Sequence, residues 1–166
     1  MAPMTPVGAV FITSAVAAAI AIWGILTQRW IARRRATLDI ILKMETDGDV
    51  IIARKTFIEL AKKPGGLAPW ADETKEQAPE TQTIKLVLNE FELISIGIQR
   101  GILDYELYRR WFCSGVIRHW KHAAPFVTAL RARLQNDAIY HEFEEMVRWF
   151  NGNPMPRRRR WLLGWF

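Results

Sequence analysis

Cysteine is nearly absent from this chain of 166 residues, because Cys113 is the only one. A single cysteine excludes an intramolecular disulfide framework and agrees with a reducing compartment. Cys113 lies in a Trp-Phe-Cys-Ser stretch and is predicted to be a small buried residue on a helix. A reactive thiol is the alternative, since Arg109 and Arg110 lie one helical turn earlier and would favour the thiolate.

Patterns that mark catalytic and metal sites are missing as well. A metal site needs three or four ligands at defined spacing. His119 and His122 are three residues apart, and His141 precedes Glu145 by four, so each place offers at most two ligands. No phosphate-binding loop or nucleophile elbow occurs. The sequence therefore predicts a protein that is not an enzyme, with no catalytic, cofactor-binding or metal-binding residue. An enzyme whose site is assembled from residues distant in the sequence is the alternative.

Side-chain charge is absent from residues 1–28, since the first charged residue is Arg29. Within this stretch, residues 7–26 are apolar except for the hydroxyls of Thr13 and Ser14. Twenty helical residues at ~1.5 Å rise span about 30 Å, the thickness of the hydrocarbon core of a bilayer. This run predicts a transmembrane anchor over residues 1–28.

A cleaved signal peptide and a buried core helix are the alternatives to an anchor. A signal peptide has a basic start and small residues at its cleavage site. Here residues 1–6 are uncharged, the alanines lie in the middle of the run, and the arginines follow it. The positive-inside rule then predicts an outside N-terminus and a cytoplasmic remainder in a bacterial inner membrane. Trp23 and Trp30 suit the interfacial belt.

Most of the excess positive charge lies in two clusters of arginine. The net charge is +6, but without these eight arginines the chain has 15 basic and 17 acidic residues. Nucleic-acid binding is therefore not expected, because such domains carry excess positive charge on the folded surface. We predict contact with anionic lipid headgroups instead. The clusters are Arg29, Arg33, Arg34, Arg35, Arg157, Arg158, Arg159 and Arg160.

Apolar periodicity predicts an all-α protein: one transmembrane helix followed by a small cytoplasmic bundle of four or five helices. Residues 29–63 are predicted to form juxtamembrane helices. The first continues the anchor helix without a break, since Leu38, Ile41 and Leu42 keep the helical spacing, and the second is capped by Asp49 and runs over 50–63. Residues 64–79, rich in proline and glycine, are predicted to be a mobile loop. The helical domain covers 80–153, with helices over 80–100, 105–122, from Pro125 onwards, and a last one capped by Asp137. Gly101 is expected to end the first of these in a left-handed conformation and Asp104 to cap the second. The first has an apolar seam suited to helix packing: Ile84, Val87, Phe91, Ile94 and Ile98.

Several short stretches of the chain resemble a family of bacterial proteins. They are Arg33-Arg34-Arg35-Ala36-Thr37-Leu38-Asp39, Leu88-Asn89-Glu90-Phe91-Glu92, Gly97-Ile98 and Gly101-Ile102-Leu103-Asp104, with Trp120, Pro125 and Phe143 also similar. The family is a domain of unknown function found in small proteins with one N-terminal membrane helix. The resemblance covers roughly residues 30–150. It implies a helical cytoplasmic domain and supplies no catalytic residues.

Residues 154–166 combine arginine with aromatic side chains. Arg157 to Arg160 precede Trp161, Trp165 and Phe166. Guanidinium groups bind phosphate and tryptophan favours the headgroup level, so this tail is predicted to lie at the membrane interface. Docking of its rings on a partner or on the protein's own core are the alternatives.

Small residues recur four apart within the apolar run, which lets membrane helices approach closely. They are Ser14, Ala15, Ala17, Ala18, Ala19 and Ala21. We therefore expect association with another membrane protein or with a second copy of this chain. Two functions follow: an accessory or interaction subunit of a larger membrane assembly, or a self-assembling sensor or effector, for example in phage exclusion or envelope stress.

Overall fold

The computed structural model describes the backbone of residues 6–152 and the side chains from residue 14 to residue 152. This part of the chain contains five α-helices and two short 3-10 helices and no strand, which confirms the all-α prediction. The helices are α1 (Pro6–Thr46), α2 (Gly48–Ala61), η1 (Ala68–Ala71), η2 (Glu73–Lys75), α3 (Pro79–Gln99), α4 (Tyr105–Leu134) and α5 (His141–Gly152).

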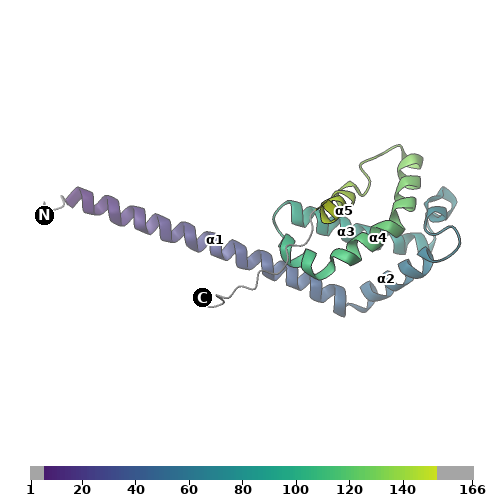
Figure 1. Ribbon diagram of the computed structural model, residues 1–166, viewed down its shortest axis with the longest axis horizontal. Helices are drawn as coiled ribbons and strands as arrows, with labels where there is room; N and C mark the ends of the chain where they lie inside the picture. Colours follow the sequence, from purple (N-terminus) through teal and green to yellow (C-terminus); the bar gives the residue numbers. More distant parts are fainter. Residues whose placement is uncertain (1–5, 153–166) are drawn as a thin grey trace.

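Helix α1 projects far from the body formed by the other helices (Figure 1). It runs unbroken for 41 residues, ~60 Å, so the predicted continuation beyond the apolar run is confirmed. The segment Ser14–Thr46 is long and apolar enough to cross a membrane. Its most apolar stretch has a mean hydropathy of 1.4 and contains no buried residue. A signal sequence near the N-terminus has the same properties.

Helix α3 is the centre of the body and contacts α2, α4 and α5. Its seam of Ile84, Val87, Phe91, Ile94 and Ile98 is buried, as its spacing predicts. Such burial stabilises each large apolar side chain by about 1.5–3 kcal/mol. The core therefore forms along the helix with the clearest sequence periodicity.

The turn between α3 and α4 follows its sequence signals closely. Gly101 has φ 67°, a left-handed conformation that glycine adopts without strain. Asp104 caps α4, since its carboxylate accepts the Leu107 N–H at 3.0 Å. Gly97 lies against the turn, because a Cβ at this position would come within 2.8 Å of Leu103 Cδ1.

Helix α4 differs from its prediction, because residues 105–122 and the segment after Pro125 form one helix. Pro125 is exposed, and so is Lys121, whose carbonyl has no N–H partner because proline lacks that group, while the neighbouring Phe126 and Val127 are buried. This burial offsets the break that proline would otherwise cause. The helix kinks instead at Phe112, which has φ −129° and ψ 15°.

The predicted N-caps of two helices, Asp49 and Asp137, are also wrong. The cap of α2 is Asp47, which accepts the N–H groups of Asp49 and Val50, so the helix begins two residues earlier than expected. Helix α5 begins at His141, after Tyr140 at φ 54°, and not behind Asp137. Its first N–H groups are bound by a carboxylate from α3, described below.

Residues 64–79 contain η1 and η2, where the sequence predicts a loop without regular structure. Leu67 and Ala71 are buried in the core, and η1 packs on α4. The Thr81 hydroxyl donates to the Trp70 carbonyl at 3.2 Å. These contacts give the segment a defined place on the body despite its composition.

Candidate functional site

The junction between α1 and the body is built by polar contacts to the α3–α4 turn. Thr37 is fully buried, and its hydroxyl accepts the Asp104 N–H at 2.7 Å and donates to the Arg33 carbonyl at 2.8 Å. Arg33 Nη2 donates to the Leu103 carbonyl at 3.3 Å. Arg34 Nε lies 3.4 Å from the Asp104 carboxylate. The apolar helix is therefore joined to the body by bonds and not only by chain connection.

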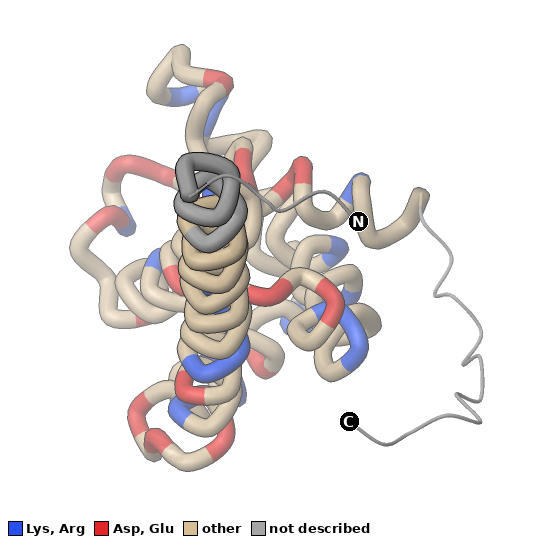
Figure 2. Tube along the Cα trace, turned by 90° about the vertical axis from the view of Figure 1, so that its left-hand side faces the viewer, with Lys and Arg blue, Asp and Glu red and all other residues tan. Residues whose placement is uncertain are grey.

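The predicted interface residues of α1 lie just before this junction and, in the case of Arg33 and Arg34, within it. Trp23, Arg29 and Trp30 are exposed, as are Arg33, Arg34 and Arg35. The Arg34 guanidinium lies 4.1 Å from the centre of the Trp30 ring, a cation–π contact. Figure 2, which looks along α1, shows an uncharged stretch of the helix that ends in basic residues near the body. The structure thus brings the Trp30 ring and the Arg34 guanidinium together at the end of the apolar run.

The small residues of the apolar run are all exposed. Helix α1 therefore presents them to whatever surrounds it. They are Ser14, Ala15, Ala17, Ala18, Ala19 and Ala21. The predicted interface residues Arg157, Arg158, Arg159, Arg160, Trp161, Trp165 and Phe166 lie outside the described residues.

An apolar groove of about 540 Å³ lies between α1, α2 and α3. Its α3 wall carries two exposed aliphatic side chains, because Leu86 and Leu93 are 57% and 70% exposed. Large aliphatic side chains gathered on one surface are typical of a protein contact. The lining residues are Ile40, Lys43, Asp49, Val50, Ala53, Leu86, Val87, Asn89, Glu90, Leu93 and Ile94.

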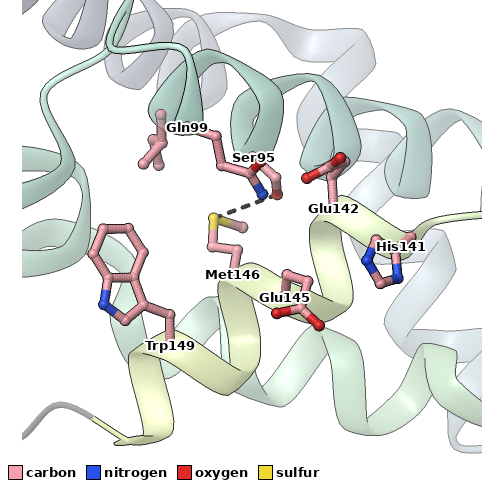
Figure 3. Close-up of a pocket in the computed structure, with 8 residues that line it drawn as sticks. Ser95, Gln99, His141, Glu142, Glu145, Met146 and Trp149 are labelled. Atoms are coloured by element: carbon pink, nitrogen blue, oxygen red, sulfur yellow. Dashed lines mark hydrogen bonds between the residues drawn. The ribbon is translucent and has the colours of Figure 1, made fainter.

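A second pocket, of about 460 Å³, lies between α3 and α5 (Figure 3). Ser95 forms its floor and donates to the Phe91 carbonyl at 2.7 Å, with the Met146 sulfur 3.5 Å from its hydroxyl. His141 and Glu145 belong to its α5 wall. Because the Ser95 hydroxyl is already bound within its own helix and no base contacts it in the described residues, the arrangement has the character of packing between two helices.

Glu92 holds α5 against α3 next to this pocket. Its carboxylate accepts the Phe143 N–H at 2.7 Å and the Glu142 N–H at 3.3 Å. Burial raises the pKa of Glu92, and the two backbone N–H groups oppose that rise. A carboxylate at a helix N-terminus binds unsatisfied N–H groups and the positive end of the helix dipole. No local sequence signal marks this cap, because it comes from 50 residues away.

A cluster of buried rings surrounds His119 in the core. His119 Nδ1 lies 2.7 Å from the Gly115 carbonyl, and its ring packs 5.1 Å from that of Phe91. Burial lowers the pKa of His119 to about 4, so the ring is neutral at pH 7. The Arg54–Glu90 ion pair, at 3.1 Å, closes this cluster, with the Arg54 guanidinium 5.5 Å from the centre of the Phe91 ring. These groups satisfy one another and serve packing.

The other sequence candidates remain apart from one another. His119 is buried while His122 is half-buried, and within the described residues no group of three or more His, Cys, Asp or Glu is arranged to hold a metal ion. Cys113 is half-buried and packs against the core beside the kink at Phe112. The groove and the Glu92 cap are the features that sequence reasoning missed; exposed aliphatic residues on α3 were the only signal for the groove.

Comparison with known families identifies the fold unit. A domain of unknown function, DUF4760, matches residues 11–149. The chain belongs to the DUF4760 family. The matched region includes most of α1 together with the body, so the apolar helix is part of the DUF4760 unit and not an addition to it. No curated protein and no solved structure matches the chain.

Proposed function

We propose that this DUF4760 chain is a single-pass inner-membrane protein with its N-terminus outside and its body in the cytoplasm, acting as an accessory or interaction subunit of a larger membrane assembly. The apolar groove between α1, α2 and α3 is the observation that carries this proposal. The partner we propose is an apolar helical segment of another membrane protein.

The membrane placement is supported by the exposure of α1. Trp23 is 73% exposed and Ile20 is 66% exposed, so water would solvate a large apolar surface if no lipid covered it. Burying apolar surface stabilises by about 25 cal/mol per Å², which favours a bilayer around this segment. Arg29, Arg33 and Arg34 at its body-side end favour a cytoplasmic body.

The position of the groove supports the choice of partner. Ile40 and Lys43 of α1 form one wall. They follow Arg29 by 11 and 14 residues, which is ~17–21 Å along the helix. A partner in the same membrane therefore needs only a short cytoplasmic extension to reach the groove. Binding there would bury Leu86 and Leu93, which the body itself leaves exposed.

Photo-crosslinking in intact membranes tests this function. A photoreactive residue replaces Leu93 in the groove, and a matched probe replaces Leu134, an exposed leucine at the end of α4 outside the groove. We expect the probe at position 93, and not at 134, to attach to a distinct membrane protein. Absence of any adduct at 93, or equal labelling at both positions, would contradict the proposed subunit role.

Self-assembly is the second candidate, supported by the exposed small residues of α1. Ser14 and Ala18, or Ala15 and Ala19, lie four apart on one face of the helix and permit close approach of a second copy. The same crosslinking experiment separates the two functions, since an adduct containing only this chain favours a sensor or effector that acts as a homo-oligomer.

A further inference from the structure

The end of the body that faces the exposed part of α1 is built from three segments. The α3–α4 turn lies there because Leu103 and Asp104 bind Arg33 and Thr37 of α1. In Figure 1 this turn is on the side of the body from which α1 projects. The position of the turn along the α1 axis is therefore fixed at the level of Arg33 and Thr37.

Helix α5 ends at the same place. Its Trp149 ring stacks on Tyr105 at the start of α4, with 4.0 Å between ring centres. Arg109 Nη2 donates to the Phe150 carbonyl at 3.4 Å. Tyr105 follows the turn directly, so the end of α5, the start of α4 and the turn form one surface, here called the proximal face.

The proximal face combines positive charge with exposed apolar groups. Ile102, at the tip of the turn, is 59% exposed although it lies beside the buried Leu103. Arg100 is exposed on the same turn, and Arg33 and Arg34 border it on α1. Asp104, a carboxylate in this turn, is bound to Arg34. Basic groups around an exposed aliphatic side chain match an anionic lipid surface, where headgroups accept the charge and the aliphatic group enters the interface.

We propose that the proximal face binds anionic lipid headgroups and that Ile102 inserts at the membrane interface, so the body rests on the bilayer beside α1. This inference rests on the proposed membrane placement of α1. If residues 7–26 fill the hydrocarbon core, Arg33 lies seven residues beyond, ~10 Å along the helix. The headgroup region on each side is about 5–8 Å thick, so the level of Arg33 lies about 2–5 Å outside its outer edge. A typical helix tilt of about 20° brings one side closer still.

Depth-dependent fluorescence quenching tests this contact in the full-length chain. Ile102→Cys, in a Cys113→Ala background, is labelled with an environment-sensitive dye and reconstituted into phosphatidylcholine vesicles with or without phosphatidylglycerol. Leu134→Cys in the same background is the matched control, because it is an exposed aliphatic residue at the other end of α4. Lipids with a quencher near the headgroup report proximity.

We expect quenching at position 102 that increases when phosphatidylglycerol is present, and none at position 134. Arg100→Gln should lower the ratio of docked to undocked bodies about fivefold in the anionic vesicles, the equivalent of ~1 kcal/mol for one basic residue, while Arg100→Lys should retain it. Quenching at 102 that equals that at 134, or that does not respond to phosphatidylglycerol, would overturn the proposal.

Carbonate extraction of the same vesicles separates the two proposals. A chain that resists extraction but shows no quenching at 102 refutes only the lipid contact of the proximal face. A chain that carbonate removes from the vesicles refutes the membrane placement itself.

Discussion

Replacing Thr37 with valine tests whether the junction of α1 with the body is a structural bond. Valine retains the shape of threonine but lacks the hydroxyl that accepts the Asp104 N–H at 2.7 Å. Thr37 is fully buried, so the Asp104 N–H would be left inside without a partner. Leaving a buried donor unsatisfied costs about 1–3 kcal/mol. The bond from Thr37 to the Arg33 carbonyl contributes little, because that carbonyl already belongs to the helix.

The assay is denaturant unfolding of the full chain in detergent micelles, together with amide exchange of the α3–α4 turn. We expect the unfolding free energy to fall by about 1–3 kcal/mol. If the Asp104 amide exchanges when the turn separates from α1, its exchange rate should rise by about 5- to 150-fold. Thr37→Ser should retain most of the stability because it keeps the hydroxyl. Thr46→Val is the matched control, since the exposed Thr46 hydroxyl bonds only the Leu42 carbonyl within α1.

A Thr37→Val protein as stable as Thr46→Val, with unchanged exchange at Asp104, would refute the reasoning. The body would then be held on α1 by apolar contacts such as those of Ile41 and Met44 alone.

Two further predictions concern the core of the body. His119 has a pKa of about 4 when folded against 6.5 for an ordinary histidine, so the unfolded chain takes up its proton first as the pH falls. Stability should therefore fall by about 3 kcal/mol between pH 6.5 and pH 4, a loss that pH-dependent unfolding should show in His122→Leu but not in His119→Leu. Gly97→Ala should lower the unfolding free energy by about 1–3 kcal/mol, because the new Cβ meets Leu103 at 2.8 Å. Thermal unfolding checks this, and Gly48→Ala, with open space around its Cβ, should show no such loss.

Local signals predicted much of this fold correctly. The seam of α3, the left-handed Gly101 and the Asp104 cap depend on residues within a few positions of one another, and such information is present in a single sequence. The unbroken path of α1 into the body followed in the same way from the spacing of Ile41 and its neighbours.

The errors arose where distant contacts outweigh local preference. Pro125 is accommodated inside α4 because the packing of Phe126 holds both halves of the helix together. Helix α5 is capped by Glu92 of α3, and residues 64–79 take their structure from Leu67 packed in the core. The groove next to Leu93 depends on three helices meeting, which no one stretch of sequence encodes.

The continuity of α1 couples the apolar segment to the direction in which the groove points. The helix has no break between Trp23 and its last residue, Thr46, so no swivel separates the two parts. One residue inserted after Gln28 would turn the body by about 100° around the helix axis and move it by about 1.5 Å, whereas seven would nearly restore its original direction. In the proposed bilayer, the face of α1 that a neighbouring helix contacts therefore determines the direction, around the α1 axis, in which the groove opens.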